Sequence, residues 1–155
     1  MAGKLQQEIE QKKPMNLLEE EVALNIARTA DLLMQGFGDL LKPYGISPTQ
    51  YNVLRILRGA GAEGVSCKDV GRRMVTRDPD ITRMMDRLET RGLLTRDRAK
   101  EDRRVVTHRL TQTGLELVNS LDGPVETAHR KALGHLPRTS LRQLIGLLEE
   151  VRAGL

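Results

Sequence analysis

One change of pattern in the middle of the chain constrains the fold more than any other feature. From Ile81 to Leu88 the apolar residues recur at helical spacing, and Gly92 follows where a helix would end in a left-handed conformation. Segments 93–96 and 105–110 then carry the β-branched and apolar residues typical of strands, and seven of the eight residues between them are charged. The sequence therefore predicts a helix followed by an antiparallel hairpin with a polar, exposed tip.

Two helices are predicted in the first 60 residues. Apolar residues at steps of three and four indicate one long amphipathic helix over 17–42, which Pro43 and Gly45 would end. Ser47 stands before a proline and is a good N-cap, so we expect a second helix to begin near Thr49.

A short third helix and a fourth helix follow. We expect Ser66 to cap the third helix, which would end near Met74, and residues 76–77 to form a tight turn. Asp78 would then cap the fourth helix, with Pro79 as its first residue. Helix, tight turn, helix and hairpin in this order predict a winged helix-turn-helix.

The C-terminal part is helical as well. Thr111 opens a helix that Asp122-Gly123-Pro124 interrupts, and a last helix is expected after Pro137. Its apolar stripe consists of Leu141, Leu144, Ile145, Leu148 and Val151. Within the chain only the helix over 17–42 offers this stripe a partner, so we expect burial in a homodimer.

These elements together predict a mainly α-helical chain with a small β-hairpin wing. We expect a polar N-terminal arm over 1–16 and a single domain over 17–155. In that domain, 49–110 would form the winged helix-turn-helix, and 17–42 and 111–155 would form the dimerisation helices.

Composition excludes several classes of protein. Aromatic residues make up only 2% of the chain, which favours packed helices over a β-sandwich. No apolar run is long enough to span a membrane, and the N-terminus lacks the apolar stretch of a secretory signal. Cys67 is the single cysteine, which rules out an intrachain disulfide and suits a cytoplasmic protein with an inert thiol.

The sequence lacks the residue patterns typical of catalytic and metal-binding sites. His108, His129 and His135 do not stand at metal-ligand spacing with Cys, Asp or Glu. The sequence shows no Ser/His/Asp set and no glycine-rich phosphate loop. We therefore expect no metal, no cofactor and no enzymatic activity.

Positive charge is concentrated in the central block. Residues 66–111 contain 13 Lys and Arg against 8 Asp and Glu, an excess of five, whereas the whole chain has a net charge of only +4. Such a block is either an ordinary solvated surface or an electrostatic footprint for phosphates. Its place on a helix-turn-helix and wing favours the second interpretation.

A spaced motif makes the resemblance to a known family specific. It consists of Ile81-Thr82-Arg83, Leu88-Glu89, Gly92-Leu93-Leu94, Asp102-Arg103-Arg104, Thr111 and Gly114. With the long first helix and the apolar last helix, it resembles the multiple-antibiotic-resistance regulator (MarR) family over nearly the whole chain. The resemblance implies an obligate dimer that binds a pseudo-palindromic operator, often released by a small anionic or aromatic effector. The chain departs from the family pattern at Asp80, where a small polar residue is usual.

The predicted fold assigns roles in binding double-stranded DNA. A helix fits the major groove with its N-terminal residues at the base edges, and a hairpin tip reaches the adjacent minor groove. The expected DNA-binding residues are Ser66, Lys68, Arg77, Thr82, Arg83, Arg87, Lys100, Arg103 and Arg104. Arg87 and Arg91 suit structural ion pairs equally well, and Asp102 is expected to orient an arginine of the wing.

Two questions stay open at the level of sequence. Phe37, Leu40, Leu41 and Tyr51 are either lining residues of an effector pocket or simply core residues. The function predicted is that of a sequence-specific regulator, most simply a repressor. The alternative is a winged-helix module that binds another protein without specific DNA binding, which the basic wing argues against.

Overall fold

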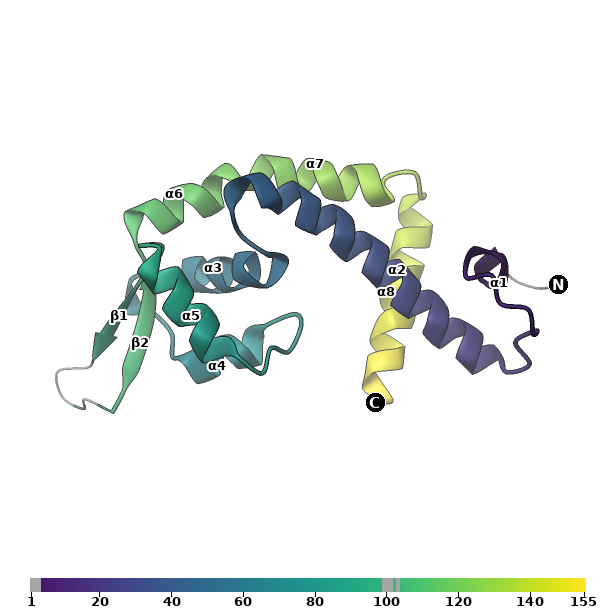
Figure 1. Ribbon diagram of the computed structural model, residues 1–155, viewed down its shortest axis with the longest axis horizontal. Coiled ribbons are helices and arrows are strands. Elements are labelled where there is room, and N and C mark those ends of the chain that lie inside the picture. The colour runs from purple at the N-terminus through teal and green to yellow at the C-terminus, as the bar shows by residue number, and fades with distance from the viewer. Residues whose placement is uncertain (1–3, 99–101, 103) are drawn as a thin grey trace.

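The computed structural model describes residues 4–98, 102 and 104–155 and shows an elongated, mostly helical molecule (Figure 1). The winged cluster of α3, α4, α5 and the hairpin lies at one end, and α1, the start of α2 and α8 lie towards the other. The α-helices are α1 Lys4–Glu8, α2 Leu18–Leu41, α3 Pro48–Ala60, α4 Cys67–Arg73, α5 Ile81–Thr90, α6 Gln112–Ser120, α7 Asp122–Leu133 and α8 Arg138–Ala153. The short 3-10 helices are η1 Lys42–Tyr44 and η2 Gly61–Glu63, and the strands are β1 Leu94–Arg98 and β2 Val106–Leu110.

Three helix starts follow from cap residues, and the sequence predicted the caps at Ser47 and Ser66. Ser47 accepts a hydrogen bond from the backbone N–H of Gln50, and the Gln50 side chain accepts one from the N–H of Ser47, which completes a capping box. Ser66 and Thr111 cap α4 and α6 through their hydroxyls. Each cap satisfies a backbone donor that the first turn leaves without a helical partner.

The predicted start of the fourth helix was wrong. α5 begins at Ile81 with Asp80 at the N-cap position, and Pro79 lies in the turn before it. Asp78 accepts the N–H of Asp80 at 2.8 Å, so its carboxylate closes a local turn in place of capping a helix. The connection from α4 to α5 therefore runs over residues 74–80 and is longer than the tight turn expected.

The hairpin is tied to the body of the winged cluster by a backbone bridge. Leu94 pairs with Leu110 and Arg98 with Val106 across the antiparallel strands. On its other side β2 meets Val65, where His108 donates its N–H to the Val65 carbonyl at 2.9 Å and accepts the N–H of Val65 at 3.0 Å. Because the base of the wing is held on both edges of β2, its direction is set by the core below it.

The hydrophobic core lies within the winged cluster and the helices that cover it. It extends from Leu41 at the end of α2 to Val125 in α7 and includes Leu54, Leu57 and Leu94. Met84 and Met85 of α5 are buried in it. The core therefore unites α3, α5, the hairpin base, α6 and the start of α7 into one packed body.

The first five turns of α2 and most of α8 lie outside this core. Their large apolar side chains are exposed in the isolated chain: Leu18, Val22, Ile26, Leu32, Leu33 and Met34 on α2, and Leu144, Ile145, Leu147 and Val151 on α8. The N-terminal segment, expected to be a polar arm, contains α1, whose Leu5 is buried. Among the described helices, none combines the length and the apolar character that crossing a bilayer requires.

Gly114 marks the closest approach between α6 and the base of the wing. A Cβ added there would fall on the carbonyl oxygen of Leu93 and lie 3.2 Å from a methyl carbon of Leu110. The same carbonyl accepts the N–H of Thr111 at 3.2 Å, so the backbone cannot easily withdraw. Only glycine lets α6 start where it does.

We expect Gly114→Ala to lower the free energy of unfolding by about 2 kcal/mol or more, because backbone must move to make room. Gly59→Ala in α3 is the matched control, since an added Cβ there meets nothing within 4 Å. It should raise the free energy of unfolding by about 0.5 kcal/mol through lower unfolded-state entropy. Urea denaturation followed by circular dichroism measures both changes, and equal effects would contradict the close packing at Gly114.

Candidate nucleic-acid interface

Helix α5 separates a buried face from a polar, exposed face. Met84, Met85 and Leu88 are buried and hold the helix in the core. Thr82, Arg83 and Arg87 are exposed on the remaining surface. An amphipathic helix that presents short polar and Arg side chains next to a hairpin has the form of a recognition helix.

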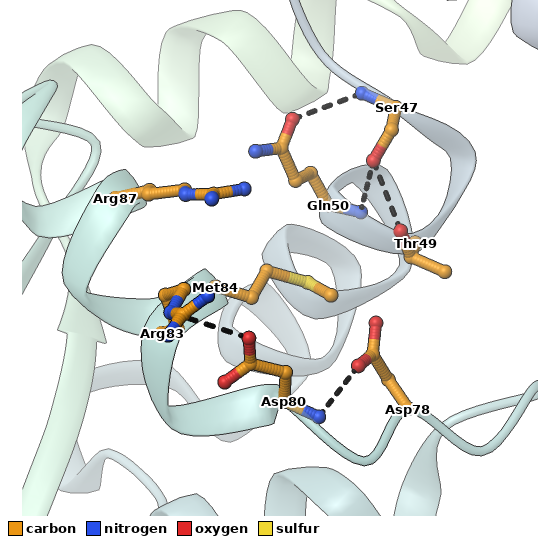
Figure 2. A pocket seen from close by; sticks show the side chains of 8 residues that line it. All are labelled: Ser47, Thr49, Gln50, Asp78, Asp80, Arg83, Met84 and Arg87. Atoms are coloured by element: carbon orange, nitrogen blue, oxygen red, sulfur yellow. Dashed lines mark hydrogen bonds and ion pairs between the residues drawn. The ribbon is translucent and has the colours of Figure 1, made fainter.

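The head of α5 adjoins the start of α3 around a small polar cavity (Figure 2). Its volume is about 250 Å³, and its lining residues are Ser47, Thr49, Gln50, Asp78, Asp80, Arg83, Met84 and Arg87. Asp80 pairs with Nε of Arg83 at 3.3 Å. Arg87 extends from α5 towards Gln50. Carboxylate and guanidinium groups therefore line this cavity together, an arrangement that the sequence alone did not reveal.

Several arginines of the basic block are engaged within the protein. Arg96 on β1 pairs with Asp86 and with Glu89 of α5, the latter at 3.4 Å, and so joins the wing to the recognition helix. Arg109 on β2 donates to Asp97 at 2.6 and 2.9 Å and to the Ala62 carbonyl at 3.0 Å. These groups hold the hairpin in position and have less freedom to meet phosphates.

Other cations in the block have no carboxylate within ion-pair distance among the described residues. They are Lys68, Arg73, Arg77, Arg87, Arg91, Arg98 and Arg104, and all are exposed. The sequence predicted DNA contacts for Lys68, Arg77, Arg87 and Arg104, and it did not single out Arg73 and Arg98. The sequence carries no signal for these two, because which cations lack a partner depends on contacts between different elements.

The tip of the wing is described only in part, and Lys100 and Arg103 lie outside the described residues. Asp102 accepts the backbone N–H of Arg104 at 2.9 Å, and its carbonyl accepts the N–H of Val105 at 3.0 Å. Asp102 was expected to orient an arginine through its guanidinium. Among the described residues it shapes the backbone at Arg104, which leaves the Arg104 side chain exposed.

Helix α4 contributes Ser66, Cys67 and Lys68 beside the recognition helix. The hydroxyl of Ser66 accepts the N–H of Asp69 at 3.1 Å and donates to the Asp69 carboxylate at 2.9 Å. Lys68 is exposed. Sγ of Cys67 lies 3.8 Å from Oγ1 of Thr82, so the thiol faces the recognition helix and is partly buried.

Arg91 does not form the ion pair that was considered for it. It donates to the carbonyl oxygen of Gly45 at 2.6 Å. This bond ties the end of α5 to the turn between α2 and α3.

The residues considered for an effector pocket lie where α2, α3 and α7 meet. Leu41 and Tyr51 are fully part of the core, and Phe37 and Leu40 pack against it. The Phe37 ring contacts Tyr51 edge-on at 5.5 Å and stacks on His129 of α7 at 5.8 Å. Burial raises the pKa of the Tyr51 hydroxyl above its usual range.

Two titratable groups mark the joints of the winged cluster. Burial lowers the pKa of His108, so this ring is neutral near pH 7 and contacts the Val65 carbonyl through Nδ1 at 3.4 Å. Arg58 on α3 donates to Asp122 at 2.9 and 3.0 Å and to Asn119 at 2.8 Å, and the first contact lowers the pKa of Asp122. Arg58 therefore bridges the break between α6 and α7.

No group of residues suited to hold a metal ion occurs in the described part of the chain.

Comparison with known proteins identifies the arrangement. Residues 46–106, from the turn before α3 to the first residue of β2, match the MarR family. A MarR transcription factor from Planctomyces limnophilus is 39% identical, with 87% of this chain and 98% of that chain covered and a TM-score of 0.68. The chain belongs to the MarR family. Both the family and the fold are those of transcription regulators rather than enzymes.

Two further proteins are similar to this MarR-family chain over most of its length. The homoprotocatechuate degradative operon repressor of Escherichia coli is 25% identical over 133 residues, which are 86% of this chain and 88% of that protein. CouR from Rhodococcus jostii RHA1, in a structure bound to p-coumaroyl-CoA, is 27% identical with a TM-score of 0.73 and covers 88% of this chain and 95% of that chain. This protein is therefore a DNA-binding transcriptional regulator with a winged helix-turn-helix.

Proposed function

We propose that this MarR-family protein is a homodimeric repressor of a pseudo-palindromic operator, released by a small aromatic or anionic effector. In each subunit α5 enters the major groove, and Arg104 at the tip of the wing reaches the adjacent minor groove. The observation that carries the proposal is the division of the basic block. Arg96 and Arg109 fix the hairpin beside α5, while exposed cations such as Arg77, Arg87 and Arg104 have no carboxylate partner among the described residues.

The expected contacts fall into two groups on this surface. Thr82, Arg83 and Arg87 stand on the exposed side of α5, where base edges would lie. Lys68, Arg77 and Arg104 stand around it and suit phosphates or the narrow minor groove. Ser66, with its hydroxyl engaged by Asp69, would contribute through the position of α4. Lys100 and Arg103 would add charge at the wing tip.

Operator binding should be strongly salt-dependent and sensitive to the wing. Each phosphate neutralised should change the slope of log affinity against log salt by about −0.9. Arg104→Ala should weaken binding by about 1–3 kcal/mol without loss of stability, because the side chain is exposed. Lys131→Ala on α7 removes the same charge far from α5 and should leave affinity nearly unchanged. Fluorescence anisotropy at several salt concentrations measures these effects, and a flat salt dependence would argue for the protein-binding alternative.

The apolar surface that the chain itself does not cover supports the proposed homodimer. Six large apolar side chains of α2 and four of α8 are exposed, and they lie away from the winged cluster. Exposed apolar surface of this extent on two helices is typical of an obligate interface between subunits. A dimer built through α2 and α8 leaves both α5 helices free, and their half-sites would be centred roughly 10 base pairs apart.

A charge placed on the exposed stripe of α8 should break the dimer without unfolding the winged cluster. Ile145 is 56% exposed, so Ile145→Lys costs the single chain little but would bury two unpaired ammonium groups in a dimer. We expect the dimer dissociation constant to rise at least about tenfold and operator affinity to fall with it. Gln143→Lys, on the opposite side of the same helix, is the control. Sedimentation velocity measures dimer formation by both variants. A wild-type protein that binds the operator fully as a monomer would contradict the dimer.

Release by an effector is proposed from the junction of α2, α3 and α7. Phe37, Leu40, Leu41 and Tyr51 gather there, beside His129 and close to the Arg58 bridge. One of the similar proteins is the repressor of the homoprotocatechuate degradative operon, and another, CouR, is bound to p-coumaroyl-CoA in its structure. A ligand bound here would favour a dimer geometry in which the two α5 helices are spaced wrongly for successive major grooves.

The effector proposal predicts a shift in operator affinity with phenolic carboxylates. If the effector favours the dimer geometry that cannot bind DNA by about 1.4 kcal/mol, operator affinity falls tenfold. Operator titrations with a panel of hydroxybenzoates and hydroxycinnamates, with melting temperature read in parallel, measure the shift. Phe37→Leu should reduce the response to any active compound. A panel that moves neither quantity would leave these residues as core residues only.

A further inference from the structure

Asp80 stands at the N-cap position of the recognition helix but does not cap it. An aspartate at this position ordinarily accepts a first-turn N–H of the helix, and Asp80 makes no such bond. Its carboxylate pairs with Nε of Arg83 at 3.3 Å. Its own N–H is donated to Asp78 at 2.8 Å, which holds the backbone in place (Figure 2). The structure therefore presents a carboxylate and a guanidinium group side by side at the head of α5.

This pair is too exposed to be explained by stability. The side chains of Arg83 and Asp80 are 69% and 56% exposed, and ion pairs in water of this kind contribute little to folding. A carboxylate at the head of a helix that enters DNA also repels the phosphates on either side. Its presence there is unfavourable for binding unless a hydrogen-bond donor on the DNA meets it.

In the major groove only one base presents a hydrogen-bond donor that has no acceptor beside it. Cytosine presents its N4 amino group, adenine presents N6 beside the acceptor N7, and guanine and thymine present acceptors only. A carboxylate accepts hydrogen bonds and cannot donate them. Asp80 is therefore matched to cytosine, whereas the Arg83 guanidinium is matched to O6 and N7 of guanine.

Building on the proposed docking of α5 in the major groove, we propose that Asp80 and Arg83 form one base-reading pair. Asp80 accepts a hydrogen bond from N4 of a cytosine, and Arg83, oriented by Asp80, donates to a guanine in the same or the neighbouring base pair. Sequences that place guanine or thymine opposite Asp80 are rejected because acceptor faces acceptor. Each half-site would then hold this cytosine and guanine where the N-terminus of α5 lies.

Selection from random double-stranded DNA tests the pair directly. The wild-type protein should enrich a cytosine and a guanine at fixed positions in each half-site, with discrimination of about tenfold at the cytosine. Asp80→Ala should lose that discrimination while binding most sequences more tightly. Asp80→Asn should shift the preference towards adenine, because an amide matches N6 and N7 together. Circular dichroism verifies that the variants are folded.

Asp69→Asn is the matched control on α4. Asp69 forms an ion pair with Arg72 at 2.9 Å over the same i,i+3 spacing, so the variant makes the same change of charge away from the head of α5, and the amide oxygen can still accept the hydrogen bond of the Ser66 hydroxyl. It should raise affinity for all sequences alike and leave base preference intact. If Asp80→Ala behaves in the same way, Asp80 acts only by repulsion and the base-reading pair is overturned.

The failure of this pair and the failure of the proposed function give different results. A wild-type protein that enriches no sequence overturns the operator-binding function and the pair with it. A wild-type operator whose base preferences survive Asp80→Ala overturns the pair alone. A preference for cytosine that Asp80→Ala removes and Asp69→Asn retains supports it.

Discussion

The packing of α5 against the core through Met84, Met85 and Leu88 determines the rest of the structure. These three side chains fix the rotation of the helix about its axis, so Thr82, Arg83 and Arg87 necessarily face outwards. Any change that turned α5 by one residue would bury charge, at a cost of several kcal/mol. The recognition surface is thus a consequence of hydrophobic burial on the opposite side of the same helix.

The wing takes its position from the same helix. Arg96 reaches from β1 to Asp86 and Glu89 of α5. The backbone of Val65 after η2, and the bond from Arg109 to the Ala62 carbonyl within η2, hold β2 from the other side. Exposed ion pairs of this kind are individually weak, but here they supplement a backbone bridge and a buried strand base. The wing and α5 therefore present their cations as one surface, which lowers the entropy lost when both engage DNA.

The long helices serve a different purpose from the winged cluster. The core closes around the last turns of α2 and the first turn of α7, and beyond that point apolar side chains face outwards. Arg58, bonded to Asn119 and Asp122 at the break between α6 and α7, stands where the two parts of the molecule join. The effector site proposed at Phe37 and Tyr51 lies close to this joint.

Local rules and spacing were enough to predict the order of the elements, the caps at Ser47 and Ser66, and the family, because each depends on residues near one another in sequence. They failed at Asp78, whose carboxylate accepts the N–H of Asp80 and closes a turn, so that the helix begins only at Ile81. The assignment of charge could not be predicted either. Whether Arg96, Arg109 or Arg98 has a partner depends on which carboxylates the folded elements bring within reach, and such contacts join residues far apart in the chain. Only the tertiary structure decides them, since the Coulomb attraction between two side chains acts over a few ångströms of space and takes no account of their separation along the sequence.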